Sequence, residues 1–398
     1  MHTEGLIMYL ARQAESQLRN ALKSGKIVIL TGARQVGKTT LVERVLAAER
    51  VTMLNFDIPF DAARFHAAAV LPPSDALKTL GDPEFLVIDE AQREPETARI
   101  VKGWYDSGLP VRIVLLGSSS LNLVSQAAES LTGRNRKLLL PPFSMHEALA
   151  AESWYHAAYP DTVLDREMVA QFRSFLLKNM VFGNYPEVVT SGKKIPLLAN
   201  LAGDYLWKDI LRLGMVKTPD LIRRLLVWLA CQIGSEISVN EIAGQLGMAR
   251  QTVDRYLDLL EETFVIFRLN SFSTNLRKEV AKGKKIFFWD TGIRNAILNR
   301  FEVSDLRADL GALFENFLVA EIMKRKTLRG DTAELYFWRS RRGAEVDLVI
   351  RDGDRTLGFE IKWSRNRKAE RSFEETYGVP VRTLTSLAPS EWPLAETK

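Results

Sequence analysis

Apolar residues in the first 150 positions form short continuous runs that alternate with segments of helical periodicity. Such runs predict buried strands, and the segments between them predict helices. Strands that alternate with helices are typical of a parallel, doubly wound α/β sheet. The Pro141-Pro142 pair closes this region, so we expect a first domain over residues 1–155. Its strands are predicted at 27–31, 51–56, 85–88, 112–117 and 136–140.

The pattern changes after residue 155. Helical spacing over 169–180, 197–213 and 221–233 predicts an all-α lid or linker at 156–235. Residues 236–299 predict a helix-turn-helix followed by a hairpin, which is the layout of a winged helix. Residues 300–398 return to mixed α/β, with a helix at 310–326 and strands near 334–338, 344–351 and 356–363. We therefore expect an α/β multidomain protein.

A glycine-rich stretch between the first strand and the first long helix fits the pattern G-x-x-x-x-G-K-[ST]. Its glycines let the backbone approach phosphate oxygens, and its N–H groups and the helix N-terminus supply positive potential. Lys38 is expected to reach the β- and γ-phosphates, and Thr39 to hold Mg²⁺. The predicted nucleotide site consists of Gly32, Ala33, Arg34, Gln35, Val36, Gly37, Lys38, Thr39 and Thr40.

Polar residues follow two further strands of the same domain, and an arginine precedes a third. Asp89 and Glu90 end one buried strand, where Asp89 would orient Mg²⁺ and Glu90 would act as general base on the attacking water. Ser118 and Ser119 end another and can hydrogen-bond the γ-phosphate or the water, although an ordinary Ser-rich turn explains them equally well. Arg134 is either an arginine finger or a surface arginine, and the sequence does not decide between them.

The order of these motifs resembles AAA-type ATPases. The sequences from Thr31 to Thr40 and from Ile88 to Gln92 are similar to those of a prokaryotic subgroup in which the ATPase precedes a "domain of unknown function 4143". Further matches lie at 182–187, 287–292 and 313–317, with one departure at Asn184, where the pattern has a second glycine. The resemblance implies a P-loop ATPase core, a winged helix and a nuclease-like end domain.

The helix-turn-helix region carries side chains suited to DNA. Ser238 and Glu241 form a capping-box pattern that opens its first helix. The second helix is predicted to expose residues that can meet base edges and phosphates, and a basic stretch follows it. A helical scaffold with a solvated hairpin is the alternative. The predicted nucleic-acid contacts are Arg250, Gln251, Thr252, Arg255, Lys282, Lys284 and Lys285.

In the end domain, Asp347 with Glu360-x-Lys362 matches the D…(D/E)-x-K pattern of the restriction-endonuclease-like fold, and Glu315 matches its additional acidic residue. A two-residue turn would place Asp347 across from Gly358 or Glu360. Carboxylates at Glu315, Asp347 and Glu360 would bind Mg²⁺ or Mn²⁺, and Lys362 would orient water. A half-exposed hairpin carrying ion pairs is the competing interpretation, and loss of cleavage is as plausible as its retention.

Composition adds few constraints. The net charge of +5 is a mild basic bias that is compatible with nucleic acid. The single Cys231 excludes an internal disulfide and suits a reducing cytoplasm, and no apolar run approaches the length of a membrane span. We expect an ATP-binding, ATP-hydrolysing protein that couples turnover to DNA binding and metal-dependent cleavage. The alternative is an ATP-controlled switch or recruiter whose end domain only binds DNA or a protein partner. For the whole chain, a homo-oligomer and a protein partner both stay open.

Overall fold

The structure is a computed structural model, and it describes residues 9–118, 131–158, 161–205, 218–273, 283–340, 342–364 and 371–393. The chain divides into two compact units. Residues 11–141 form the first unit, and most of the chain from residue 142 onward forms the second. The three regions predicted after residue 155 therefore share one unit.

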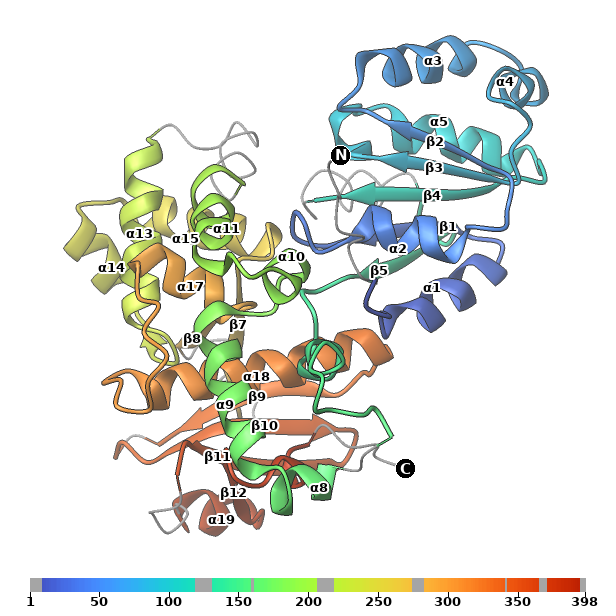
Figure 1. The fold of residues 1–398 in the computed structure, drawn as a ribbon. Coiled ribbons are helices and arrows are strands. Elements are labelled where there is room, and N and C mark those ends of the chain that lie inside the picture. Colours follow the sequence, from blue (N-terminus) through green and yellow to red (C-terminus); the bar gives the residue numbers. More distant parts are fainter. Residues whose placement is uncertain are drawn as a thin grey trace. The chain divides into compact units, whose positions relative to one another are not determined.

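The first unit is built on a five-stranded sheet in the order β2-β3-β4-β1-β5 (Figure 1). Each pair of neighbouring strands is parallel, which confirms the predicted α/β core. Strands β1 and β3 are buried at every position because helices cover both of their faces, whereas the edge strand β5 is partly exposed. The strands are β1 (Ile27–Thr31), β2 (Val51–Asn55), β3 (Phe85–Asp89), β4 (Arg112–Gly117) and β5 (Asn135–Leu139).

Helices cover this sheet on two sides. Phe65 of α3, Ala76 of α4 and Trp104 of α5 pack into one core with Ile27 and Ile29 of β1. The intervening residues of β1 face the opposite side, where α1 contacts β1, β5 and α2. This is a doubly wound arrangement. The helices are α1 (Ala14–Lys23), α2 (Lys38–Val45), α3 (Pro59–Ala69), α4 (Pro73–Thr79) and α5 (Thr97–Asp106), with a short 3₁₀ turn η1 (Ala91–Arg93) after β3.

The second unit contains a seven-stranded sheet in the order β12-β11-β10-β9-β7-β8-β6. Its centre joins two regions that the sequence predicts as separate domains, because β7 of the hairpin region pairs in parallel with β9 of the end region. The seven strands therefore form one continuous sheet. They are β6 (Glu236–Ile237), β7 (Ile266–Ser271), β8 (Lys284–Phe288), β9 (Glu334–Arg339), β10 (Glu345–Asp352), β11 (Arg355–Lys362) and β12 (Val381–Thr385).

The helices of the second unit include a 20-residue helix, α18, that contacts both β8 and β11. Asn316 on α18 is fully buried, and its side-chain amide exchanges two hydrogen bonds of 2.8 Å with the backbone of Phe288 in β8. The described helices are α7 (Met145–Leu149), α8 (Asp161–Arg166), α9 (Val169–Phe182), α10 (Pro186–Thr190), α11 (Lys194–Asn200), η2 (Leu201–Tyr205), α13 (Pro219–Cys231), α14 (Val239–Leu246), α15 (Arg250–Glu262), α17 (Thr291–Leu298), α18 (Leu310–Arg329), α19 (Arg371–Tyr377) and η3 (Pro389–Glu391).

Two of the sequence motifs in this unit meet at Asp290. Its carboxylate caps α17 at the N–H of Ile293 and accepts from the N–H of Asn184 at 2.7 Å. A Cβ on Gly183 would lie 1.9 Å from the same carboxylate, so glycine is required at that position. The Asn184 side chain is buried and donates to Glu321 at 3.3 Å. The departure from glycine at Asn184 thus adds a buried hydrogen bond without disturbing the loop.

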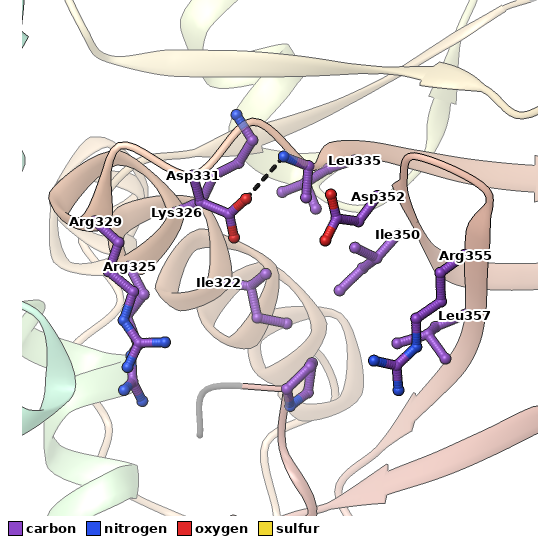
Figure 2. Close-up of a pocket in the computed structure, with 12 residues that line it drawn as sticks. Ile322, Arg325, Lys326, Arg329, Asp331, Leu335, Ile350, Asp352, Arg355 and Leu357 are labelled. Atoms are coloured by element: carbon purple, nitrogen blue, oxygen red, sulfur yellow. Dashed lines mark hydrogen bonds between the residues drawn. The ribbon is translucent and has the colours of Figure 1, made fainter. Parts of the chain in front are cut away.

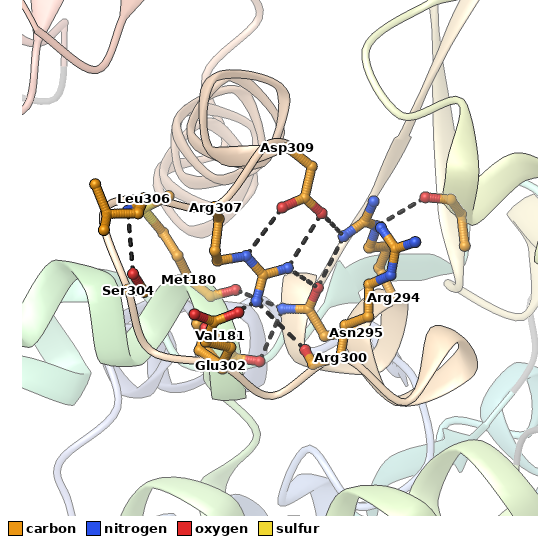
Figure 3. A network of polar contacts seen from close by, with 11 residues as sticks. Met180, Val181, Arg294, Asn295, Arg300, Glu302, Ser304, Leu306, Arg307 and Asp309 are labelled. Atoms are coloured by element: carbon orange, nitrogen blue, oxygen red, sulfur yellow. Dashed lines mark hydrogen bonds and ion pairs between the residues drawn. The ribbon is translucent and has the colours of Figure 1, made fainter.

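A polar network joins α9, α17 and the start of α18 (Figure 3). Asn295 donates to the carbonyls of Met180 and Val181 near the end of α9. The guanidiniums of Arg294 and Arg307 both reach the carboxylate of Asp309. Burial alone would raise the pKa of Asp309, but the hydrogen bonds from Arg307 and Arg294 outweigh it and lower that pKa to about 2.

Candidate functional site: the nucleotide loop and a buried carboxylate cluster

The glycine-rich loop connects β1 to α2, and its backbone shape explains its glycines. Gly37 immediately precedes α2 with φ of 88°, a left-handed conformation that favours glycine. A Cβ on Gly32 would lie 2.2 Å from the carbonyl oxygen of Leu140, so a larger residue would displace the chain that follows β5. Gln35 also takes a left-handed conformation, with φ of 61°. These turns fold the loop around the first turn of α2.

In the structure, Thr39 of the loop lies beside Asp89 at the end of β3, and Lys38 directly precedes Thr39. The Lys38 ammonium is buried and donates to the carbonyls of Gly32 and Ala33, both at 2.9 Å, which holds it inside the loop. The Thr39 hydroxyl donates to one oxygen of the Asp89 carboxylate at 2.7 Å. Hydroxyl and carboxylate oxygens are the hard donors that Mg²⁺ takes, so the donors at this end of β3 fit that ion.

Glu90 follows Asp89 in a left-handed conformation with φ of 52°, which is uncommon for a non-glycine residue. Burial raises the pKa of Glu90 above its ordinary value, against the lowering effect of the Lys38 ammonium. The side-chain amide of Gln92 donates to Glu90 at 2.6 Å and to the hydroxyl of Ser118 at 3.2 Å. Gln92 therefore links Glu90 and Ser118, both of which the sequence predicts to be catalytic. Ser119 lies outside the described residues.

Arg12 is a residue of this site that the sequence motifs do not reveal. Its guanidinium is buried and donates to the carbonyl of Val36, inside the loop, at 2.7 Å. It also donates to the carbonyl of Pro141, beyond β5, at 2.8 Å. Arg12 thus ties the loop to the end of the first unit. It precedes α1 and belongs to no motif, so local pattern offers no signal for it.

Arg134 lies away from the nucleotide loop of its own chain. Its carbonyl accepts from the N–H of Ile27, at the start of β1, whereas the loop follows the other end of that strand. Five strand residues span about 16 Å at roughly 3.3 Å each. The exposed Arg134 side chain pairs instead with Asp106 at 2.6 Å. A finger role in cis is therefore excluded by geometry, and a role in trans stays a prediction.

The helix-turn-helix region has the predicted elements, α14 and α15, with Gly247 in a left-handed conformation between them. Arg250, Gln251 and Arg255 are exposed on α15, and Thr252 is half-buried. Lys284 is exposed at the start of β8, and Lys282 lies outside the described residues. One prediction is wrong: Lys285 is 1% exposed, so its ammonium faces the interior of the unit and not a nucleic-acid backbone.

The β10–β11 hairpin brings the end-domain residues together. Leu348 pairs with Phe359 and Asp352 with Arg355, so the turn is at Gly353-Asp354 and the register places Asp347 across from Glu360. The buried carboxylate of Asp347 accepts from the Lys362 ammonium at 3.0 Å and from the N–H of Ile361 at 2.7 Å.

Lys285 reaches the same cluster from β8. Its ammonium donates to Glu315 at 2.9 Å and forms a second ion pair with Glu345. Within the described ranges, no group of three or more His, Cys, Asp or Glu side chains is arranged to hold a metal ion. The metal site predicted from Glu315, Asp347 and Glu360 is therefore not found as such. Two of those carboxylates, Glu315 and Asp347, are paired with the ammonium groups of Lys285 and Lys362.

A pocket lies at the other end of the same hairpin (Figure 2). Ile322 and Leu357 are among its apolar lining residues, and Arg325, Arg329 and Arg355 contribute basic side chains. None of the residues predicted to be functional lines it.

Three family descriptions match successive parts of the chain. Residues 24–149 match an AAA domain, residues 173–304 match a domain of unknown function (DUF8612), and residues 310–387 match a domain of unknown function (DUF4143). The first and third matches confirm the expected AAA-type domain followed by domain 4143. The second spans the helical region and the helix-turn-helix, which the sequence interpretation treats as two domains.

Relatives that match most of the chain carry the description "uncharacterized protein". The chain is 29% identical over 397 residues to uncharacterized protein Rv2008c of Mycobacterium tuberculosis, covering 97% of this chain and 82% of that protein. It is 23% identical over 367 residues to uncharacterized protein MJ1544 of Methanocaldococcus jannaschii, covering 88% and 78%. A solved structure, the Walker-type ATPase PABY2304 of Pyrococcus abyssi, aligns with a TM-score of 0.50 at 15% identity, covering 75% of this chain and 97% of that one.

These similarities and the loop geometry agree on a P-loop ATPase fold in the first unit, and they support ATP binding and hydrolysis. Across the parts of the chain that are described, no helix is both long and apolar enough to cross a bilayer.

Proposed function

We propose that the protein binds ATP with Mg²⁺ and hydrolyses it at the loop between β1 and α2. The observation that carries the proposal is the convergence of Lys38, Thr39 and Asp89, with the Thr39 hydroxyl 2.7 Å from the Asp89 carboxylate. Lys38 would bind the β- and γ-phosphates, and Thr39 with Asp89 would hold Mg²⁺, directly or through its water shell. The ion would supply positive charge for the phosphate oxygens.

Glu90 is proposed as the general base that orients and deprotonates the attacking water. Its raised pKa brings it closer to neutrality, where a base is effective. Gln92 supports this role, because its amide nitrogen holds Glu90 while its carbonyl oxygen is buried without a hydrogen-bond partner among the described residues. That oxygen can accept a hydrogen bond from the water. Ser118, held by the same amide nitrogen, would face the γ-phosphate.

Steady-state turnover and nucleotide binding test this assignment. Lys38→Ala should lose both, whereas Glu90→Gln should keep ATP binding and lose about 10²–10⁴-fold in turnover. Glu84→Gln is a matched control, because Glu84 lies at the opposite end of β3 and pairs with Arg112 at the surface. Wild-type turnover in Lys38→Ala, or an equal loss in Glu84→Gln, would contradict the proposed site.

The second unit is proposed to bind DNA through a winged helix-turn-helix. Strands β6, β7 and β8 form antiparallel pairs next to α14 and α15, and α15 exposes Arg250, Gln251 and Arg255. Anisotropy of a labelled duplex at two salt concentrations should show weaker binding and a smaller salt dependence in Arg250→Ala/Arg255→Ala. Arg223→Ala/Arg224→Ala, exposed on α13, is the control. Equal affinity in all three proteins would exclude α15 as the contact.

Of the two roles considered for the end domain, its ion pairs favour an ATP-controlled switch or recruiter over a metal-dependent nuclease. Cleavage needs a divalent ion at Glu315, Asp347 and Glu360, and two of these carboxylates are paired with ammonium groups. A switch predicts that ATP changes DNA affinity in the wild type and leaves it unchanged in Lys38→Ala. The same affinity with and without ATP in the wild type would exclude that coupling.

A further inference from the structure

A lysine ammonium lies among the carboxylates of the second unit. Lys285 is 1% exposed, and its Nζ is 2.9 Å from Glu315 and also ion-paired with Glu345. The ring centroid of Phe337 lies 5.7 Å from the same nitrogen and closes one side with an aromatic face. Glu315 projects from α18 and Glu345 from the start of β10, so the lysine joins three elements that are distant in sequence.

A second ammonium group lies in this cluster. The neighbouring carboxylate, Asp347, is paired with Lys362 at 3.0 Å. Burial alone would lower the pKa of Lys285, but the nearby carboxylates, first Glu315 and then Glu345, outweigh it and raise that pKa. The ammonium therefore remains charged at neutral pH. Buried carboxylates without such a partner would carry a large desolvation cost.

A divalent ion and this ammonium would compete for the same oxygens. Mg²⁺ takes an octahedron of oxygen ligands at about 2.0–2.1 Å and keeps several of its waters. The Lys285 ammonium already lies within hydrogen-bond distance of Glu315, and the Lys362 ammonium within hydrogen-bond distance of Asp347, so a divalent ion among these carboxylates would be repelled by both. We propose that Lys285 is the permanent counter-cation of this cluster, that it takes the place of a divalent metal ion, and that the end domain therefore binds neither Mg²⁺ nor Mn²⁺.

Strand pairing holds the backbone of Lys285 beside the cluster. Lys285 pairs with Leu269 of β7 on one side and with Glu236 of β6 on the other, so its backbone is held within the sheet. A Cβ on Gly234 would lie 3.3 Å from the Glu315 carboxylate, which shows how closely the backbone packs on that carboxylate. The Cα of Lys285 is therefore fixed beside the cluster, and the ammonium can leave Glu315 only by rotation about its own side-chain bonds.

Titration of the full chain with Mn²⁺, monitored by electron paramagnetic resonance without nucleotide, tests the proposal. All proteins carry Asp89→Asn, which removes the metal ligand proposed at the nucleotide loop. The chain with native Lys285 should bind no Mn²⁺ at the end domain, and adding Asp347→Asn should change nothing. Lys285→Met should gain about one tight Mn²⁺ per chain, because the freed carboxylates offer hard oxygen ligands. That gain should disappear in Lys285→Met/Asp347→Asn. Lys284→Met, the exposed neighbour, should behave like the native lysine chain.

Two results of the Mn²⁺ titration would overturn the proposal. One is Mn²⁺ binding by the native lysine chain that is lost on Asp347→Asn, and the other is a folded Lys285→Met chain that gains no Mn²⁺. Circular dichroism establishes whether Lys285→Met folds. Where it does not fold, the comparison of native lysine chains with and without Asp347→Asn decides the question. Plasmid cleavage in Mg²⁺ or Mn²⁺ that needs Asp347 would also refute it.

Discussion

Replacing Arg12 by alanine should loosen the nucleotide loop, and the structure gives the size of the effect. The guanidinium makes hydrogen bonds of 2.7 Å to Val36 and 2.8 Å to Pro141 in a buried setting. A hydrogen bond from a charged donor contributes about 1.5–3 kcal/mol. Losing both should lower the free energy of unfolding of the first unit by about 3–6 kcal/mol. The Val36 carbonyl also lies inside the loop, so its release should raise KM for ATP.

Urea unfolding and steady-state ATP turnover, both on the full chain, measure these two effects. Arg12→Lys retains the charge but has no guanidinium fork to bridge two carbonyls, so it should recover only part of the stability and of the KM. Arg19→Ala is the control, because Arg19 is exposed on α1 and donates to the Val45 carbonyl at a longer 3.3 Å. The reasoning is refuted if Arg12→Ala unfolds at the wild-type urea concentration and keeps the wild-type KM. A stability loss with KM unchanged would make Arg12 a purely structural residue.

Three further predictions concern other groups. The proposed base Glu90 must be deprotonated to act, and its pKa is raised. In a profile of kcat against pH, turnover should therefore be lost on the acid side at a pH above 4.5, the ordinary glutamate value. A loss that begins only at or below pH 4.5 would contradict this assignment. Asp309→Asn should lower the free energy of unfolding by about 2 kcal/mol at pH 7, because the folded pKa of Asp309 is lowered from 3.8 to about 2. This stabilisation is present above pH 3.8 and is lost as the pH falls through about 2. The urea midpoints of wild type and variant should therefore converge in acid. Arg134→Ala should leave ATP binding unchanged and reduce kcat only at protein concentrations where chains associate, because Arg134 cannot reach its own loop; a reduction in a chain shown to be monomeric by sedimentation would contradict this.

The first unit could be predicted from sequence because its signals are local. β1 and β3 are continuous apolar runs of the length of one strand, and the residues that bind phosphate follow directly in the chain. The loop carries its own backbone requirement at Gly37, so its motif specifies a conformation as well as a composition. Arg12 escaped prediction because its contacts are to backbone carbonyls, one of them 129 residues away. Carbonyls are the same in every residue and leave no trace in the sequence.

The second unit was harder because its organisation depends on pairing between distant strands. β7 and β9 pair at two positions only among the described residues, Asn270 with Tyr336 and Ser271 with Phe337, and this short ladder unites two predicted domains. Within the β10–β11 hairpin, by contrast, the turn chemistry reduced the register to two alternatives, and the structure has one of them. The sequence therefore predicts the local hairpin, but it does not show which strands join to form the whole sheet.

Lys284 and Lys285 show how one residue of register changes a functional interpretation. Adjacent strand residues face opposite sides of a sheet, so two neighbouring lysines cannot both lie on an exposed face. Lys284 is exposed, and Lys285, which shares a face with the buried Phe287, extends to Glu315. A basic pair at the end of a charged stretch is a pattern that predicts phosphate contacts. Because adjacent side chains on a strand alternate between faces, at most one of these two lysines can make them. The other supplies the positive charge that lets buried carboxylates exist without a metal ion, and the proposed metal titration of Lys285→Met tests that distinction.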